Sequence, residues 1–289
     1  MDETAVTSSP EKSPRLAGHV GREISRGNPW YTEEQTRLLL DGPYRHVTAH
    51  RQAIFARMLR AAIRRENPVV ADLGCGDGTW LPFLRSYSRR LLGLDYNPLR
   101  LGRAHRSVLP AGLVQGSLDA LPLRDGTVDI LFLNQVLEHI PHSHIDQVLQ
   151  ECRRALRTDG SLILSVPHEG HWLARLHYRR LQPRIMRETD HKQFFTRRTL
   201  EALLARNGFR VEECQVLGFH VPHIRLHTLC LEARWACKML DWMGRVIPSL
   251  STTFFMRLAV QQEDSPPRGT AISALLDRTT SIEGNSHPA

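Results

Sequence analysis

Short apolar runs alternate with longer segments of helical spacing along most of the chain. Apolar or β-branched runs that end in Gly, Asp or Asn predict strands, and apolar residues three or four positions apart predict helices. The predicted strands cover 68–73, 91–95, 112–115, 128–133, 161–166, 209–217 and 253–261. The predicted helices cover 44–65, 79–87, 143–157 and 197–206, with a further helix opened by Asn97 and Pro98 and a turn at 157–160. This alternation predicts an α/β fold in which helices cover a mostly parallel sheet.

The two ends of the chain depart from this pattern. Residues 1–28 and 263–289 mix Ser, Pro, Gly and charged residues without periodicity, so we expect disordered tails there. The remaining residues, 29–262, are predicted to form a single domain with an insert.

That insert, 220–248, fits neither a strand nor a short loop. On a helical projection its large apolar residues share one side and its charged residues lie opposite, which predicts an amphipathic helix. The apolar side comprises Leu229, Leu231, Trp235, Ala236, Met239, Leu240, Trp242, Met243 and Val246, and the other side Arg234, Lys238, Asp241 and Arg245. Such a helix packs on a core, covers a hydrophobic acceptor or lies in a membrane interface, and the sequence leaves these three alternatives open.

Composition narrows the class of protein. Hydrophobic residues make up 41% of the chain and charged residues 24%, which excludes a wholly disordered or collagenous protein. No apolar signal core or membrane-spanning run is evident, so we expect a cytoplasmic protein, with peripheral membrane contact left open. The five cysteines form no CxxC pair and predict reduced thiols.

The net charge of +8 is concentrated in one segment. Between His171 and Arg210 ten basic residues stand against three acidic ones, a local balance of +7: Arg175, Arg179, Arg180, Arg184, Arg187, Lys192, Arg197, Arg198, Arg206 and Arg210 against Glu188, Asp190 and Glu201. Either this is a solvated helical face, or it attracts an anionic substrate or surface.

Three glycines, Gly74, Gly76 and Gly78, directly follow the first predicted strand in VVADLGCGDG. Glycine permits positive φ and close approach of a ligand, and the next helix offers unpaired N–H groups. The spacing GxGxG differs from the dinucleotide fingerprint GxGxxG, and Asp72 would repel a pyrophosphate but accept a hydrogen bond from a protonated amine. The second predicted strand ends in Asp95, which can accept both hydroxyls of a ribose.

These residues resemble the class I S-adenosylmethionine-dependent methyltransferases, in particular the small-molecule enzymes of quinone and natural-product pathways. The resemblance lies in ADLGCGDG, LGLDYNP, LVQGSLDALPLRDGTVDILFLNQVLEHI, LRTDGSLILSVP and DHKQFFTRRTLEALLARNGF, and covers about 68–217. It implies a Rossmann-like fold with a mostly parallel seven-stranded sheet, an antiparallel last strand and a helical insert before that strand. It also implies S-adenosylmethionine as cofactor and methyl transfer to a small molecule.

The resemblance further implies which residues bind the cofactor. The glycine turn would border the methionine part of the cofactor, and Asp95 would bind the ribose. The residues after Asp95 would lie beside the adenosine, the end of the third strand would contact the adenine, and the end of the fourth strand would lie near the reacting methyl. These residues are Asp72, Gly74, Cys75, Gly76, Gly78, Asp95, Tyr96, Asn97, Ser117, Leu118, Asn134 and Gln135. Many relatives carry Asp where Ser117 stands, which makes Asp119 a second candidate for the adenine amine.

Two histidines are candidate catalytic bases. Methyl transfer from a sulfonium is an in-line displacement that needs alignment and exclusion of water, and a base only where the acceptor must lose a proton. His139 follows the fourth predicted strand, and His191 lies in the segment 170–195, which together with 220–248 is predicted to face the acceptor. Each histidine has an alternative role in bonding or capping local backbone. No metal site is predicted, because sequence alone does not show that ligands converge.

The acceptor is predicted to be a small molecule, hydrophobic or anionic, and oxygen is the preferred atom for methylation. A nucleic-acid acceptor is disfavoured, because Asn134-Gln135-Val136-Leu137 lacks the Asn-Pro-Pro-Tyr type of tetrad that grips a flipped base. A non-catalytic binding protein on the same fold is the alternative from another class, and an NAD-dependent oxidoreductase ranks lower. The oligomeric state is left open.

Overall fold

The computed structural model describes residues 44–107, 112–181, 191–221 and 224–261. Both predicted tails lie outside these residues and remain predictions. Within the described ranges, no helix is long and apolar enough to cross a membrane.

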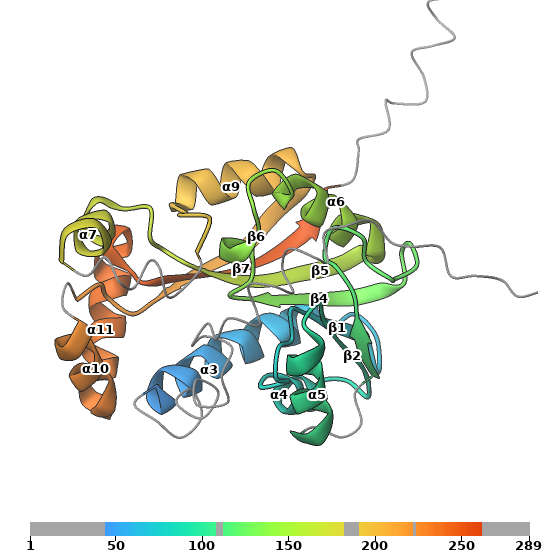
Figure 1. Ribbon diagram of the computed structural model, residues 1–289, viewed down its shortest axis with the longest axis horizontal. Helices are drawn as coiled ribbons and strands as arrows, with labels where there is room; N and C mark the ends of the chain where they lie inside the picture. The colour runs from blue at the N-terminus through green and yellow to red at the C-terminus, as the bar shows by residue number, and fades with distance from the viewer. Residues whose placement is uncertain (1–43, 108–111, 182–190, 222–223, 262–289) are drawn as a thin grey trace, which may run out of the picture.

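A seven-stranded sheet in the order β3-β2-β1-β4-β5-β7-β6 crosses the centre of the molecule (Figure 1). β1 to β5 pair in parallel, and β7 runs antiparallel between β5 and β6. The strands are β1 (Val69–Leu73), β2 (Arg90–Asp95), β3 (Gly112–Gln115), β4 (Val128–Asn134), β5 (Leu156–Pro167), β6 (Phe209–Leu217) and β7 (Thr253–Val260). The mostly parallel Rossmann-like sheet with an antiparallel last strand is thereby confirmed.

Helices cover both faces of this sheet (Figure 1). One face carries α3 (Arg45–Ala62), α4 (Leu81–Arg85) and α5 (Pro98–Ser107), and the other carries α6 (Ile145–Ala155) and α9 (Arg197–Arg206). Successive strand residues point to opposite faces: Val70 shares a core cluster with Phe55 of α3, and Ala71 shares another with Leu149 of α6. Because both faces are buried, strands such as VDILFLN are apolar at nearly every position.

Two local predictions have different outcomes. Asn97 caps α5 as predicted, since its Oδ1 accepts hydrogen bonds from the N–H groups of Leu99 at 3.0 Å and Arg100 at 3.3 Å. The turn at 157–160 lies inside β5, where the pairing with β4 shifts from Leu156 directly to Ser161. Asp129 of β4 lies opposite this irregularity and is paired with Arg65 at 2.6 Å and Arg157 at 3.3 Å. These ion pairs keep the looped residues attached to the sheet edge.

The segments that follow β5 and β6 are helical in a way that the sequence pattern predicts only in part. After β5 come α7 (Trp172–Leu176) and a π-helical turn, η3 (His177–Leu181), neither of which was predicted. The insert is helical as expected, but it forms two helices, α10 (Ile224–Glu232) and α11 (Arg234–Val246), which break at Ala233, and a short turn, η4 (Pro248–Leu250). A short turn, η2 (Leu137–His139), follows β4.

The predicted grouping of the insert's apolar residues on one side is wrong for α11, because Ala236 and Leu240 lie on the opposite side from the tryptophans. α11 buries Ala236, Cys237, Leu240, Asp241 and Gly244, whereas Trp235 and Trp242 are 71% and 63% exposed. A Cβ on Gly244 would collide with the backbone carbonyl of Gly218, so α11 approaches β6 through its small residues. The tryptophan side therefore faces outward.

Candidate functional site

The turn after β1 requires its three glycines. Gly74, Gly76 and Gly78 have φ values of 75°, 55° and 78°, in the left-handed region that side chains disfavour. A Cβ on Gly74 would lie 2.7 Å from a methyl of Val136. The N–H of Gly74 donates to the carbonyl of Leu94 at 2.7 Å, which fixes the turn against the end of β2. A Cβ on Gly76 would likewise collide with the guanidinium of Arg100. The turn lies at the carboxyl edge of the sheet, where open parallel sheets bind ligands.

Asp95 ends β2 directly beside this turn. Its Oδ2 accepts a hydrogen bond from the N–H of Gly76 and its Oδ1 one from the N–H of Asn97, both at 2.8 Å. Burial raises the pKa of Asp95, and the two backbone donors oppose that shift. Each carboxylate oxygen has a further lone pair, so the group is positioned to accept hydroxyl donors as well.

Asp72 is a second buried acid at this edge. Its side chain is buried, and its Oδ2 has no hydrogen-bond partner among the described residues. Burial, and then the neighbouring charge of Asp95, raise the pKa of Asp72 to about 8. A cationic donor at this edge would satisfy the unpaired oxygen and favour the ionised form. Asn97, whose Nδ2 is likewise buried and unpartnered among the described residues, adds a donor nearby.

The other residues of the glycine turn have packing roles. The sulfur of Cys75 lies against Gly93 of β2, since a Cβ on that glycine would be 3.0 Å from it. Burial raises the pKa of this thiol, so it is a packed apolar group rather than a nucleophile. Asp77 pairs with Arg100 and Arg103 of α5, each at 2.9 Å, which ties the turn to α5. Tyr96 is 42% exposed beside it.

The loop after β3 carries the residues predicted for adenine. Ser117 Oγ donates to the carboxylate of Asp119, so these two candidates for the adenine contact form a linked pair. Leu118 packs against the core. His144 lies 3.3 Å from Asp119, and Gln147 donates to its backbone carbonyl at 2.8 Å.

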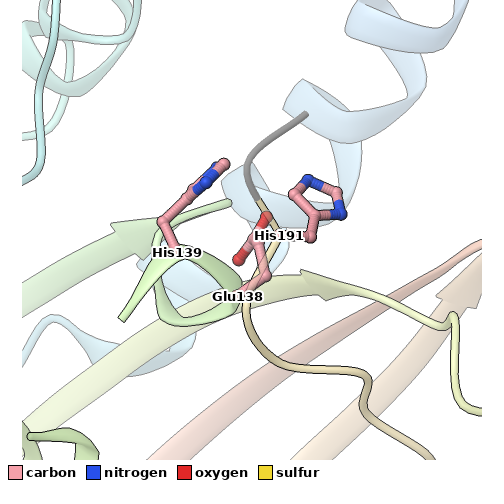
Figure 2. A group of neighbouring side chains, drawn as sticks. All are labelled: Glu138, His139 and His191. Atoms are coloured by element: carbon pink, nitrogen blue, oxygen red, sulfur yellow. The ribbon is translucent and has the colours of Figure 1, made fainter. Parts of the chain in front are cut away.

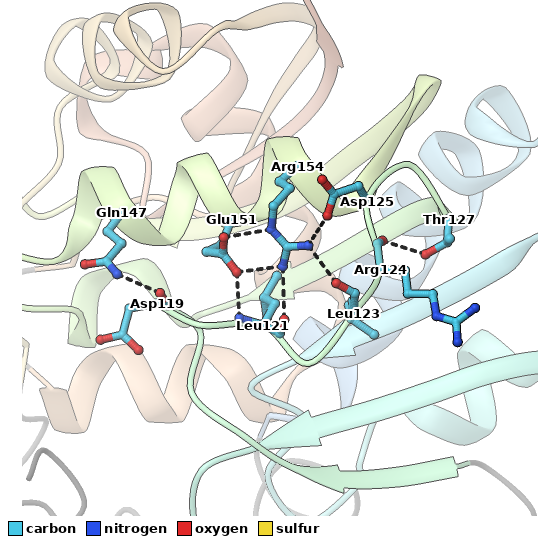
Figure 3. Close-up of polar contacts among 9 residues, drawn as sticks. All are labelled: Asp119, Leu121, Leu123, Arg124, Asp125, Thr127, Gln147, Glu151 and Arg154. Atoms are coloured by element: carbon cyan, nitrogen blue, oxygen red, sulfur yellow. Dashed lines mark hydrogen bonds and ion pairs between the residues drawn. The ribbon is translucent and has the colours of Figure 1, made fainter. Parts of the chain in front are cut away.

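Arg154 of α6 holds the next part of this loop (Figure 3). Its guanidinium donates to the carbonyls of Leu121 at 3.0 Å and Leu123 at 2.7 Å, and it pairs with Glu151 and Asp125. Glu151 in turn accepts the N–H of Leu121 at 2.8 Å. The loop that bears Ser117 and Leu118 is therefore clamped to α6 at its far end.

The end of β4 brings Asn134 and Gln135 to the same edge. Ser165 of β5 donates to Asn134 Oδ1 at 2.6 Å and lies 3.2 Å from Gln135 Nε2. Gln135 has a φ of 57°, a conformation that non-glycine residues rarely adopt. Such strain is common at functional sites. No sequence pattern points to Ser165, because its contacts depend on the register between β4 and β5.

Glu138, His139 and His191 come together just beyond β4 (Figure 2). One ligand-type atom from each lies within 4.8 Å of the others, and the two imidazole rings are 5.0 Å apart. The backbone N–H groups of Lys192 and Gln193 donate to the carbonyl of Glu138 at 2.7 and 3.0 Å, which anchors the segment after His191 to η2. The two histidines, 52 positions apart in the sequence, thus share one site.

Glu169 is a residue of this site that the sequence reading missed. Its carboxylate lies 2.7 Å from Nδ1 of His191 and fixes the orientation of that ring. The motif HEGHW could have pointed to Glu169, because it begins at His168, directly after the end of β5. Residues at that position reach the carboxyl edge of a parallel sheet.

Glu138 is a buried acid whose charge interacts with His191, Glu169 and Arg51. It is 1% exposed, and neither carboxylate oxygen has a hydrogen-bond partner among the described residues. Burial raises the pKa of Glu138 to about 8. The cluster can therefore exchange a proton near neutral pH, and one carboxylate with two imidazoles is also a donor set that suits a divalent cation.

The basic residues between His171 and Arg210 lie at both edges of the sheet. Arg206 and Arg210 flank the start of β6, at the opposite edge, where they pair with Asp146 and Glu212. Arg197 pairs with Glu201 within α9. Lys192 follows His191 at the carboxyl edge. Arg184 and Arg187 lie outside the described residues, so the local excess of charge is only partly a property of the site.

Comparison with known proteins shows which family part of the chain resembles. Residues 71–164 match the family model described as "Methyltransferase domain". A probable S-adenosylmethionine-dependent methyltransferase of Mycolicibacterium smegmatis is 28% identical over 166 residues, 56% of this chain and 58% of that protein. Residues 71–164 are thus similar to a methyltransferase domain, and the sheet has the fold of class I S-adenosylmethionine-dependent methyltransferases.

Two further matches to this methyltransferase domain extend the comparison. A malonyl-(acyl-carrier protein) O-methyltransferase of Methylococcus capsulatus is 36% identical over 160 residues, 52% of this chain and 56% of that protein. The structure of Haemonchus contortus phosphoethanolamine N-methyltransferase 2 with S-adenosyl-L-methionine has a TM-score of 0.54 at 14% identity, and the match covers 78% of this chain and 60% of that one. The chain spans less than two thirds of the curated relatives cited here. The acceptors in the names of these relatives are therefore properties of those proteins and are not transferred to this chain.

Proposed function

We propose that this protein transfers the methyl group of S-adenosylmethionine to a small-molecule acceptor, with oxygen as the preferred acceptor atom. One observation carries the proposal. Parallel pairing of β1 with β2 and β4 brings Asp72, the glycine turn and Asp95 to the same edge of the sheet as the segment after β4, where Glu138, His139 and His191 cluster. The first group of residues fits the cofactor, and the second group fits activation of an acceptor.

The residues at the glycine turn fit S-adenosylmethionine in charge and shape. The unpartnered Oδ2 of Asp72 accepts a hydrogen bond from the ammonium of the methionine part. The positive φ values of Gly74 and Gly76 let the turn fold back against the end of β2, beside Asp95. Asp95, already held by two backbone donors, accepts the ribose hydroxyls. Asn97 Nδ2 and the linked pair of Ser117 and Asp119 are the polar groups offered to the adenosine. When bound, the cofactor supplies a methyl group activated by positively charged sulfur.

Glu169 and His191 form the proposed base. An imidazole that donates its Nδ1 proton to Glu169 has its lone pair on Nε2, where it accepts the proton of an acceptor hydroxyl. The carboxylate then stabilises the resulting imidazolium. His139, with its ring 5.0 Å away, helps to position the acceptor. The O-methyltransferase of M. capsulatus supports oxygen as the acceptor atom.

The first experiment measures cofactor binding. Calorimetric titration is expected to show that the protein binds S-adenosylmethionine and its demethylated product, and that Asp95→Ala weakens both by about 10- to 100-fold, the loss for charge-assisted hydrogen bonds. No binding by the wild-type protein would overturn the proposal.

The second experiment measures methyl transfer to a panel of phenols, carboxylates and amines. His191→Asn and Glu169→Gln are expected to lower kcat by about 100-fold or more on a hydroxyl acceptor while cofactor affinity stays unchanged, because general bases contribute roughly that factor. His105→Asn, an exposed histidine on α5, is the matched control. Unchanged turnover in both site variants would show that alignment alone suffices.

A second role for the cluster is favoured by the two unpartnered oxygens of buried Glu138. Glu138, His139 and His191 could together hold a divalent cation that binds the acceptor oxygen. Turnover after treatment with EDTA separates the two roles. A general base keeps its activity, whereas a cation site loses activity and regains it with added Mg²⁺ or Mn²⁺.

A further inference from the structure

The outward side of α11 is a stripe of large apolar residues. Trp235, Met239, Trp242 and Val246 are spaced at i, i+4, i+7 and i+11, and their exposed fractions are 71%, 42%, 63% and 58%. That spacing places them on one narrow side of the helix. Exposed tryptophans are rare on monomeric surfaces unless the surface binds something. We call these four residues the tryptophan stripe.

Three cations run along one flank of this stripe. Arg234, Lys238 and Arg245 each precede a stripe residue by one position, and all three are exposed. The remaining acid of the helix, Asp241, is buried and paired with His50 of α3. Glu232, at the end of α10, is the exposed acid nearest in sequence. The outward surface of α11 thus combines apolar bulk with net positive charge.

The buried side of α11 fixes this orientation. Leu240 and Cys237 pack in a small core with Leu231 of α10, and Gly218 donates its N–H to Asp241 at 3.1 Å. The stripe therefore cannot turn inward without breaking these contacts. Its exposure is a property of how the insert docks on α3 and β6.

α7 and α10 lie at the same end of the molecule as α11 (Figure 1), and they also carry exposed apolar residues. His177 of η3, which follows α7, contacts His220 at 3.0 Å, just before α10. Trp172 and Leu176 of α7 are 68% and 46% exposed. Leu226 and Leu229 of α10 are 52% and 63% exposed.

We propose that α11 docks the protein on an anionic membrane surface, with the tryptophan stripe inserted at the level of the headgroups. Helices with an apolar strip flanked by Lys and Arg lie in the interface plane, where tryptophan prefers to sit and anionic lipids attract the cations. The charges favour this occupant over a second copy of the chain, because two identical faces would bring their cations together. The proposal does not depend on the identity of the methyl acceptor.

The test is sedimentation of the full-length protein with lipid vesicles. The protein is expected to bind phosphatidylglycerol-rich vesicles but not pure phosphatidylcholine vesicles, with binding that weakens as salt is added. The variant Arg234→Gln, Lys238→Gln, Arg245→Gln should lose about 100-fold in partition coefficient, at roughly fivefold for each charge near the surface. The variant Arg64→Gln, Arg89→Gln, Arg90→Gln is the matched control, because these exposed cations lie around the C-terminal end of α3 and the start of β2.

A second variant tests the apolar part. Trp235→Gln with Trp242→Gln should lower the partition coefficient by at least tenfold while the circular dichroism melt stays unchanged, since both side chains are exposed. Absence of binding to anionic vesicles by the wild-type protein would overturn the proposal. Equal losses in the two charge variants would reduce it to unspecific attraction and also overturn it. A wild-type dimer that the tryptophan variant dissociates would assign the stripe to a second copy instead.

Discussion

Asp72→Asn is expected to stabilise the cofactor-free protein increasingly as the pH rises. The folded protein holds a proton on Asp72 up to a pKa of about 8, whereas the unfolded chain releases it near 3.8. Because the folded state binds the extra proton, stability falls by about 1.4 kcal/mol for each pH unit between these values. From pH 5 to pH 8 the unfolding free energy of the wild type falls by about 4 kcal/mol from this group. Asparagine does not titrate, so the variant does not lose this amount.

Urea denaturation at pH 5, 6, 7 and 8 measures this effect as the difference in unfolding free energy between the variant and the wild type. The difference should grow in favour of Asp72→Asn along the series. Glu66→Gln, which removes an exposed carboxyl group, is the control for loss of a surface charge. A difference that stays constant within about 1 kcal/mol would refute the argument that burial holds Asp72 in its protonated form.

The same group should couple cofactor binding to proton release. A cation placed beside Asp72 favours the ionised carboxylate, so binding of S-adenosylmethionine at pH 7 should release up to one proton. Calorimetry in phosphate and in Tris detects this release as a difference in binding enthalpy between the buffers. Asp72→Asn should abolish the difference and weaken binding by about 10- to 100-fold. Equal enthalpies for the wild type would contradict contact between the cofactor's cation and Asp72.

Three further outcomes follow from particular contacts. Arg154→Ala should lower the unfolding free energy by about 2–3 kcal/mol, because two loop carbonyls and Glu151 lose their donor, and a thermal melt that matches the wild type would contradict the clamp. Gly74→Ala should weaken cofactor binding more than tenfold, since its φ of 75° and the 2.7 Å approach to Val136 exclude a side chain, whereas Gly102→Ala on α5, where the nearest atom is 4.0 Å away, should leave binding unchanged. Burial lowers the pKa of His220 to about 3, so the unfolded chain binds a proton below pH 6.5 that the folded protein does not bind. The unfolding free energy of the wild type therefore falls as the pH falls from 6.5 to 5, and that of His220→Gln should fall by about 1–2 kcal/mol less.

The sheet and one half of the site could be predicted because their signals are local in the sequence. A strand followed by glycines, and a strand that ends in an acid, place Asp72, Gly76 and Asp95 without any knowledge of tertiary packing. Parallel pairing of β1 with β2 then brings the strand ends to one edge, and the N–H of Gly76 meets Asp95 at 2.8 Å. Local pattern and tertiary structure agree here, which is what a well-specified fold requires.

The partners of Asn134 and His191 could not be predicted from local pattern. Ser165 reaches Asn134 only because β4 and β5 pair with the register that follows the irregularity opposite Asp129. Glu169 reaches His191 across 22 positions of chain, part of which lies outside the described residues. Contacts of this kind depend on the final packing of loops, and no periodicity in the sequence encodes them.

The insert shows why helical periodicity leaves the direction of a face undetermined. The projection groups Ala236 and Leu240 with the tryptophans, yet the structure buries the first two and exposes the tryptophans. Nor does a projection say which side of a helix meets the protein. That choice depends on close approach: Gly244 lies against the backbone of Gly218, and Asp241 bonds to His50 and Gly218. A tryptophan at the position of Gly244 would not fit, so the small and polar side packs inward and the large side remains outside. The packing of α11 thus keeps its apolar side exposed, and this exposure is explained if that side binds a lipid surface. The flanking cations fit the same explanation, because they attract anionic lipids.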